Sequence, residues 1–350
     1  MDTLPKACVI LGAGASFDVR GEGSPAIRPE FRPPLAKDLF DIENHKAYWE
    51  ILNIYHGAKV LTQRLAPIIS SGQASVESAL KKYAEHPDDR IRSHFKCIPA
   101  YLRDLIHVAS SSYTYMPSSY IELAIELLAE QPHDVLFIVL NYDTLLESAL
   151  SWFDKKLQFD NISAYIDPNH PAKVVKFHGS TNWFAGIPES SNISWDNAIE
   201  QFDISAKVAE GQVRIKNNVS VVRDSHDSNL KLYPILTAPL AGKGVSDVVC
   251  PESHIKVAKE FLSDCQKFII IGTSGLDEDL LSFLDSTLGS SITYYHVHIV
   301  GSGSETDEAQ RRFIGSVRAF HNYIPNENVW RKGFRAYLKN GLKVFLEFRM

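Results

Sequence analysis

The chain has 350 residues, of which 45% are hydrophobic and 22% are charged, and its formal net charge is −6. This composition is typical of a soluble globular protein, and the negative charge argues against direct nucleic-acid binding through a broad cationic surface. No apolar run reaches the length of a membrane span, and the N-terminus lacks the pattern of a signal peptide. We therefore expect a cytoplasmic protein with no membrane partner.

Four cysteines are scattered along the chain and form no Cys-x-x-Cys pair: Cys8, Cys97, Cys250 and Cys265. This spacing fits a reducing compartment and excludes a cysteine zinc ribbon. His296 and His298 would lie on the same face of one strand, but the sequence offers no evident third ligand. We therefore predict that the protein holds no metal.

In chain order, the first predicted element is a buried strand at Ala7–Leu11, which leads into the turn Gly12-Ala13-Gly14-Ala15-Ser16. The glycines would let the backbone approach a phosphate, and a helix starting here would favour an anion at its N-terminus. A plain strand-to-helix turn explains the same residues equally simply. Phe17 stands where a dehydrogenase fingerprint has its third glycine, so hydride-transfer enzymes of that kind are disfavoured.

The next 110 residues or so contain a loop and a helical segment. Residues 21–35 are rich in glycine and proline, which predicts either a loop that covers a ligand or a plain connection. Residues 36–130 carry helical spacing of apolar side chains, for example at Lys37–Tyr55 and Tyr101–Ala109. We interpret this segment as a helical insertion between the first two core strands.

Three further predicted strands lead into a polar or glycine-containing triplet: Val135–Leu140 precedes Asn141-Tyr142-Asp143, Lys173–Phe177 precedes His178-Gly179-Ser180, and Phe268–Ile271 precedes Gly272-Thr273-Ser274. The first and third of these strands are apolar runs. Open α/β sheets bind ligands at the carboxyl ends of their strands, so we expect a crevice where these ends meet the first glycine turn. Structural roles remain open for each motif. Asn141 or Asp143 can cap the following helix, and a His-Gly turn can be purely structural.

The remaining segments alternate between strand and helix patterns: strands at Ile162–Ile166, 213–215, 219–222, 232–237, 295–300 and 344–348, and helices at 197–208, 251–262, 276–288, 305–321 and 331–339. This alternation predicts an α/β fold, a Rossmann-like parallel sheet with helices on both faces and a helical insertion after the first strand. We expect a single domain over residues 1–350, with residues 36–130 as an insertion within it.

Taken together, the four polar motifs resemble those of the sirtuins. The turn at Gly12–Ser16 is similar to their Gly-Ala-Gly-x-Ser loop, and Asn141–Asp143 is similar to their Asn-Ile-Asp triplet. His178-Gly179 resembles the pair that carries their catalytic base, and Gly272–Ser274 resembles their Gly-Thr-Ser turn. The motifs occur in the family's order and cover roughly residues 7–20, 135–184 and 266–300.

Two departures separate the chain from sirtuin deacylases. Those enzymes generally carry a four-cysteine zinc module after the His-Gly turn, and this sequence has none. The Pro-Asp-Phe-Arg element that follows their glycine loop is matched only loosely, by Pro29–Arg32, and further along the chain than usual. The segment Pro33–Leu39 instead looks like the loop of sirtuin-like NAD-cleaving effectors in bacterial antiphage defence, and the Pro-rich approach to Lys243 also resembles that branch. Those effectors also lack the zinc module and carry a helical insertion.

The resemblance implies a role for each motif. Asn141 and His178 would be catalytic, because an uncharged amide can orient a ribose and a water while a histidine acts as the base. Asp143 would accept from the nicotinamide carboxamide, and Thr273 and Ser274 would contact the ribose or phosphates. NAD is implied as the substrate, and the residues implied to bind it are Gly12, Ala13, Gly14, Ser16, Asp143, Gly272, Thr273 and Ser274.

On this basis we expect an NAD glycohydrolase that releases nicotinamide and ADP-ribose and serves as an antiphage effector, depleting NAD when activated. The resemblance also implies a homo-oligomer and a separate activating protein, either an ATPase or an Argonaute-like protein. Two alternatives are an NAD-dependent protein deacylase and a non-catalytic sensor of NAD or ADP-ribose.

Overall fold

The computed structural model describes residues 4–17, 33–35, 38–40, 49–71, 79–80, 82–83, 86–95, 97–111, 118–186, 219–222, 232–236, 249–288, 294–321 and 324–348. Most of the predicted loop at 21–35 lies outside these residues, as do the predicted helix at 197–208, the predicted strand at 213–215 and the turn around Lys243. Within the described part of the chain, no helix combines the length and apolar character needed to cross a membrane.

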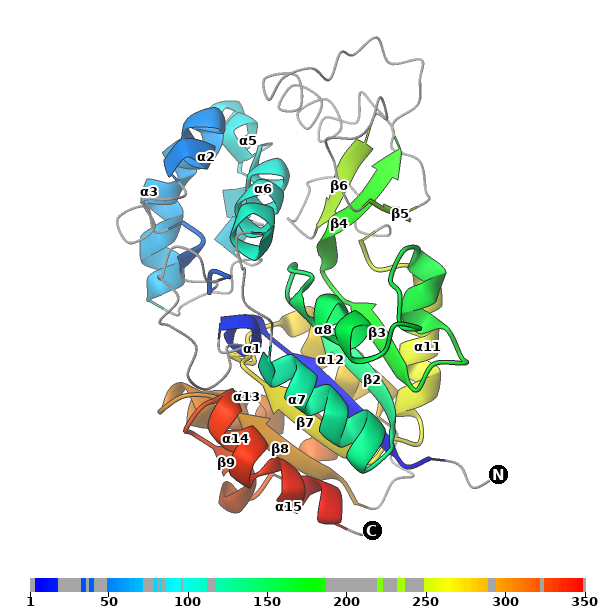
Figure 1. Cartoon of the computed structure of the whole chain (residues 1–350). Helices are drawn as coiled ribbons and strands as arrows, with labels where there is room; N and C mark the ends of the chain where they lie inside the picture. The colour runs from blue at the N-terminus through cyan, green and yellow to red at the C-terminus, as the bar shows by residue number, and fades with distance from the viewer. Residues whose placement is uncertain are drawn as a thin grey trace.

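The centre of the molecule is a parallel sheet of six strands (Figure 1). Its order is β3-β2-β1-β7-β8-β9, which is the strand order of a Rossmann fold, with the switch point between β1 and β7. The strands are nearly continuous apolar runs because both faces of a parallel sheet are covered. Their bounds are β1 Lys6–Leu11, β2 Asp134–Val139, β3 Ala172–Lys176, β7 Lys267–Ile271, β8 His296–Val300 and β9 Val329–Trp330.

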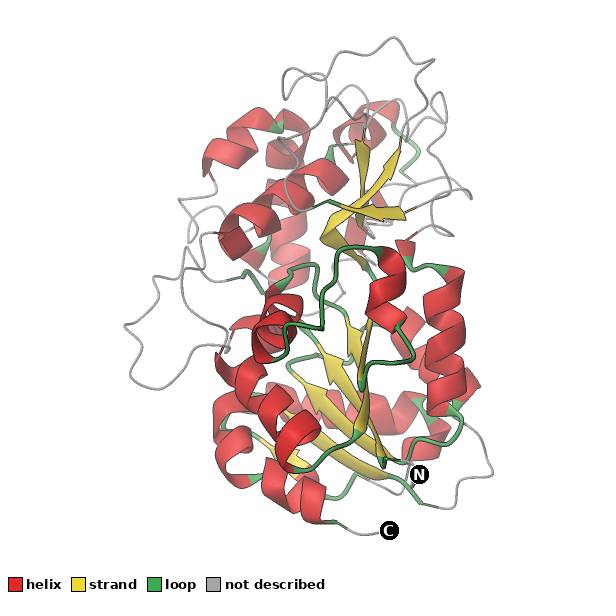
Figure 2. Ribbon diagram, turned by 45° about the vertical axis from the view of Figure 1, so that its right-hand side comes forward, coloured by secondary structure: helices red, strands yellow, loops and turns green. Residues whose placement is uncertain are grey.

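Helices cover both faces of this sheet, as Figure 2 shows. Alternate residues of β2 point to opposite sides, so that Phe137 packs in one core cluster and Leu136 in the other. The first face carries α7 (Ser118–Ile125), η4 (Glu126–Glu130), α8 (Leu145–Phe153), α14 (Phe334–Asn340) and α15 (Leu342–Glu347). The second carries α11 (Glu252–Leu262), α12 (Glu278–Thr287) and α13 (Glu305–Ser316). The predicted α/β architecture is therefore confirmed.

Between β1 and β2 the described residues are mainly helical, as predicted. After the short α1 (Ala13–Phe17), the described helices that share a separate hydrophobic core are α2 Trp49–Ile54, α3 His56–Ser70, α5 Asp89–Phe95 and α6 Ile98–Ser111. The helices α7 and η4 also fall within the range 36–130, but they pack on the main sheet. The single-domain assignment over residues 1–350 stays a prediction.

A second, antiparallel sheet of three strands lies beside the helical insertion (Figure 1). Its order is β5-β4-β6, with β4 at Gly179–Gly186, β5 at Val219–Val221 and β6 at Leu232–Leu236. Helix α6 contacts both β4 and β6. The insertion and the small sheet therefore form one layer above the strand ends of the main sheet.

Two predicted strands are wrong. Ile162–Ile166 is a 3-10 helix, η5, because the Asn161 side chain accepts from the Ala164 backbone N–H at 3.0 Å and starts a helical turn. The predicted closing strand at 344–348 lies mostly in α15, where Leu342, Phe345 and Leu346 have helical spacing and bury one face. Two short 3-10 turns, η6 (Arg318–Phe320) and η7 (Asn326–Asn328), connect α13 to β9.

Candidate active site

The carboxyl ends of four strands meet at one edge of the main sheet. In the register of the sheet, Leu11 pairs with both Val139 and Ile271, and Val139 pairs with Lys176. Neighbouring strands lie about 4.8 Å apart. The residues that follow these strands, from the glycine turn to His178, are therefore brought to the same edge, as the sequence predicted.

The two glycine turns pack directly on each other. The N–H of Gly12 donates to the Ile271 carbonyl and the N–H of Gly14 to the Gly272 carbonyl, both at 2.9 Å. Gly272 has φ +64°, and a Cβ atom there would lie 2.2 Å from the Ala15 nitrogen. These glycines are thus required by the close approach of two backbones. The N–H groups of Gly12 and Gly14 are both bonded to protein carbonyls, so a phosphate near this turn would need other donors. That Gly12 and Gly14 take part in NAD binding stays a prediction.

Asn141 is held by a hydrogen-bonded chain of buried side chains. Its Nδ2 donates to Ser16 Oγ at 2.7 Å, and Ser16 Oγ lies 2.9 Å from Tyr120 Oη. Burial raises the pKa of Tyr120, so this residue stays a neutral hydroxyl. Among the described residues, the Asn141 Oδ1 atom has no hydrogen-bond partner although it is buried. The amide is therefore fixed at its nitrogen and presents an acceptor oxygen, and it does not cap α8.

His178 follows β3 and contacts a carboxylate from another part of the chain. Its Nε2 is hydrogen bonded to Asp277 Oδ2, and both side chains are largely buried. The next residue, Gly179, has φ +80°, and a Cβ atom there would lie 2.2 Å from the Ile235 carbonyl oxygen. Only glycine lets β6 pair so closely with β4 (Gly179–Gly186) at the residue after the histidine.

Asp143 lies one residue before Thr144, the N-cap of α8. Its Oδ1 accepts from the Leu145 N–H at 3.0 Å and so supports the start of the helix, one of the two roles open to it from sequence, while Oδ2 is left for a ligand contact. Beneath it, the fully buried Lys176 donates to the Asp143 carbonyl oxygen and pairs with Glu147 Oε1 at 3.2 Å. Burial raises the pKa of Glu147, while Lys176 opposes the rise. The ion pair of Lys176 and Glu147 thereby stabilises the turn after β2.

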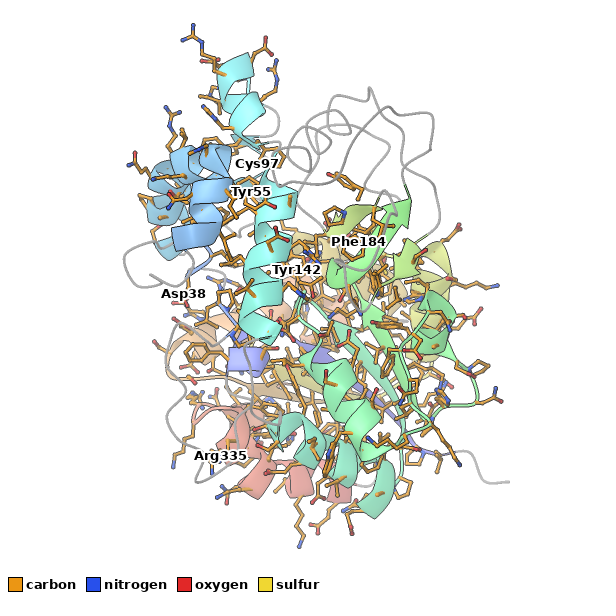
Figure 3. The ribbon with its side chains drawn as sticks, turned by 45° about the horizontal axis from the view of Figure 1, so that its top comes forward. Asp38, Tyr55, Cys97, Tyr142, Phe184 and Arg335 are labelled. Atoms are coloured by element: carbon orange, nitrogen blue, oxygen red, sulfur yellow. The ribbon has the colours of Figure 1, made fainter. Side chains whose placement is uncertain are left out.

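Tyr142 connects the site to the helical insertion. Its side chain belongs to the hydrophobic core of the insertion, and its ring centroid lies 6.4 Å from that of His178. Figure 3 shows Tyr142 beside α6, between the insertion and the main sheet. Arg103 of α6 also reaches the small sheet, where Nε donates to the Thr181 carbonyl at 3.4 Å and the guanidinium stacks over Phe184. The insertion therefore contacts the turn that carries Asn141, through Tyr142, and the strand that follows His178, through Arg103.

The other predicted ligand residues line the rim of this edge. Ala13 and Gly14 are partly exposed, Ser16 is buried, and Thr273 is partly exposed. Ser274 is exposed, and its carbonyl oxygen accepts from Arg312 Nη1 at 2.7 Å. All the predicted ligand residues follow β1, β2 or β7.

Sequence reasoning missed three partners of the site: Tyr120, Lys176 and Asp277. Lys176 lay inside the predicted strand Lys173–Phe177, and Tyr120 lay inside the predicted helical segment 36–130. Asp277 lay inside the predicted helix at 276–288, and the pattern gave no sign of a histidine partner. All three contacts join segments that are distant in sequence, so residue spacing could not reveal them.

No group of three or more metal-ligating side chains occurs among the described residues. The absence of a metal from the function stays a prediction. All four cysteines are unpaired, and Cys8, Cys97 and Cys265 are buried.

The fold and the site define a Rossmann-like α/β protein with a paired histidine and carboxylate and an oriented amide at the carboxyl edge of its sheet. No family model and no curated protein matches the chain. Among solved structures, one described as "Structural Basis for the Mechanism and Regulation of Sir2 Enzymes" is similar over 85% of this chain and 81% of its own, with 15% sequence identity and a TM-score of 0.35.

Proposed function

We propose that the protein is an NAD glycohydrolase, which cleaves NAD to nicotinamide and ADP-ribose. The observation that supports this most is the joint placement of two groups at one sheet edge. The Asn141 amide after β2 is fixed so that it presents its oxygen. After the neighbouring strand β3, the His178 imidazole is held by the carboxylate of Asp277, which precedes α12. The order of the four motifs, similar to that of sirtuins, supports the choice of NAD.

The reaction requires little from a general acid. The bond that breaks joins the ribose C1′ to the nicotinamide nitrogen, whose ring is already positively charged, so nicotinamide leaves as a neutral molecule. The developing sugar cation resembles the oxocarbenium ion of glycoside hydrolysis. A water oxygen then bonds to C1′ and releases one proton. The protein must orient the ribose, admit one water and accept that proton.

The two central residues are suited to these tasks. The Asn141 oxygen can accept a hydrogen bond from a ribose hydroxyl or from the attacking water. His178 can take the proton from either group as a general base. Asp143 would accept from the carboxamide of nicotinamide through Oδ2, since Oδ1 is used by α8.

The glycine turns would form the floor for the pyrophosphate. With the N–H groups of Gly12 and Gly14 engaged, contacts to phosphate would come from Ala13, Ser16, Thr273 and Ser274. The glycines contribute through the space they leave, because a side chain at Gly12 would collide with Gly272 and Thr273.

The cellular role follows from the resemblance to defence effectors. We propose that the protein depletes NAD during phage infection, in the cytoplasm, as a homo-oligomer released by a separate ATPase or Argonaute-like protein. Tyr142 packs into the core of the insertion, and Arg103 of the insertion contacts the small sheet at Thr181, so assembly through the insertion could affect the site by these two contacts. Light scattering at micromolar concentration tests the assembly, and a monomer that hydrolyses NAD at full rate without a partner would contradict it.

Time-resolved measurement of nicotinamide release tests the activity. We expect release from NAD alone, matched by equimolar ADP-ribose, and no acceleration by an acylated lysine peptide. Strong acceleration by the peptide would point to the deacylase instead. Binding of NAD without any release, under conditions that assemble the protein and after its partner is added, would point to the sensor.

A further inference from the structure

Asp277 connects the histidine of the site to a helix on the opposite face of the sheet. It precedes α12 and uses its two carboxylate oxygens for different partners. Oδ1 accepts from the Leu280 N–H at 2.9 Å, and Oδ2 contacts His178 Nε2. The Asp277 side chain is 13% exposed and that of His178 is 5% exposed. Two elements distant in sequence are thereby locked together inside the protein.

The hydrogen bond to the start of α12 holds the Asp277 carboxylate in place and favours its ionised form. Asp277 has the extended backbone of an N-cap residue, and the start of a ten-residue helix favours a negative charge there. Burial is the largest influence on its pKa and raises it. The hydrogen bonds from His178 and from the Leu280 and Asp279 N–H groups nevertheless hold the pKa below its ordinary value. The residue is therefore an anion at neutral pH, facing an imidazole.

A carboxylate in this place determines what the imidazole can do. Because a carboxylate can only accept, the proton of the neutral ring must lie on Nε2, and the ring's lone pair lies on Nδ1. The same charge stabilises the imidazolium that forms when the ring accepts a proton, and it holds the ring plane in one orientation. An amide at this position would instead donate to Nε2 and favour the other tautomer.

We propose that Asp277 is a positioning residue for His178: it selects the tautomer of the catalytic base and stabilises its protonated form. This inference rests on the proposed function for its catalytic meaning, but the geometry it describes exists without substrate. The helix cap alone does not require this arrangement, since a cap needs one acceptor and serine or asparagine supplies it equally well.

The decisive variant is Asp277→Asn, which preserves shape and cap but removes the charge and the obligatory acceptor. We expect kcat for nicotinamide release to fall about 10²–10⁴-fold with little change in KM for NAD, because the variant alters the base and not the ribose contacts. We also expect the acid limb of the pH–rate profile to move to lower pH, since the imidazolium loses its counter-charge. The variant Asp277→Ser, which keeps the cap and loses contact with the ring, should lose activity similarly.

Two controls separate this role from a structural one. Asn161→Ala removes another side-chain cap, which accepts from the Ala164 N–H at 3.0 Å beside η5, and it should leave kcat unchanged. Nitrogen-15 NMR of histidine-labelled protein without substrate, with His178 assigned through His178→Ala, reports the tautomer directly. We expect the Nε2–H form in the wild type and its loss in Asp277→Asn.

An unchanged ring spectrum in Asp277→Asn would overturn the inference, and so would wild-type kcat in a folded variant. If the wild type releases no nicotinamide, the proposed function fails, and the ring spectrum alone then decides whether Asp277 sets the tautomer.

Discussion

Two groups of buried histidines lie at different places in the same sheet and have opposite surroundings. At the carboxyl edge, His178 contacts the Asp277 carboxylate. On β8, His296 and His298 lie with ring centroids 4.7 Å apart among aromatic rings, and His296 stacks on Phe348 at 4.1 Å. Both groups are buried, so burial by itself does not distinguish them. What differs is the partner: an anion for His178, and uncharged aromatic side chains, with the Tyr337 hydroxyl on His298, for the other two.

The pKa values of the second group show the consequence. Burial lowers the pKa of His296 to about 4, and the nearby Lys267 lowers it further in the same direction. Burial also lowers the pKa of His298 to about 3, helped by His296. Such rings stay neutral and serve as packing groups. A buried histidine thus becomes a candidate base only where the fold also brings an acid to it.

The largest expected effect separates the two groups by activity. His178→Ala and Asn141→Ala should each reduce nicotinamide release about 10²–10⁴-fold, because each removes a positioned group from the reacting centre. His296→Phe, the matched change at the other group, should leave the rate per folded molecule unchanged. Near wild-type release by either site variant, with its fold intact by circular dichroism, would remove the role assigned to that residue.

The second effect concerns the backbone that carries His178. Gly179→Ala should lower the free energy of unfolding by about 3 kcal/mol or more, because it places a Cβ atom at positive φ and against the Ile235 carbonyl. Gly315→Ala, in α13 with open space around it, is the control and should stabilise by about 0.5–1 kcal/mol. Urea unfolding measures both. Equal stability of the two variants would show that β6 does not approach Gly179 closely enough to exclude a side chain there.

The third effect is the pH dependence of stability at β8. In the unfolded chain His296 gains a proton as pH falls below about 6.5, while in the folded protein the ring stays neutral until about pH 4. Stability should therefore fall between these values, by about 3 kcal/mol for this residue. His296→Phe should remove that loss, leaving stability at pH 7 nearly unchanged, because neither ring nitrogen has a hydrogen-bond partner among the described residues.

Melting temperatures between pH 4 and 7 test this prediction. His56→Gln, which removes an exposed histidine from the first residue of α3, is the control and should keep the wild-type slope. A wild-type slope in His296→Phe would mean that this ring already titrates normally in the folded state.

The smallest expected effect is that of metal removal. Elemental analysis should find no stoichiometric zinc, and EDTA should change neither melting temperature nor nicotinamide release. The pair His296 and His298 is the nearest approach to a ligand set on β8, yet one of its rings is hydrogen bonded to Tyr337 Oη at 3.2 Å. One tightly held zinc per chain would contradict the prediction.

The sequence by itself determined the main architecture and the edge that carries the site. The apolar runs within β1, β2 and β7 have no polar face, so they had to lie inside a covered parallel sheet. Polar residues directly after such runs must lie at its carboxyl edge, which placed Asn141 and His178 near the glycine turns. The spacing of apolar residues distinguishes helix from strand less clearly in a short segment that buries only one side. For this reason residues 344–348 were predicted as a strand, although they lie mostly in α15.

Only the tertiary structure decided how these residues are held. The partners of Asn141 and His178 are Ser16, 125 residues away, and Asp277, 99 residues away. The spacing of residues along one element predicts its faces, but it carries no information about which loops from distant elements come into contact. The same limit hid the use of the Gly12 and Gly14 N–H groups, because their acceptors belong to β7 and the turn after it. Contacts of this kind depend on the strand order 3-2-1-7-8-9, which places β1 and β7 side by side and exists only once the sheet has formed.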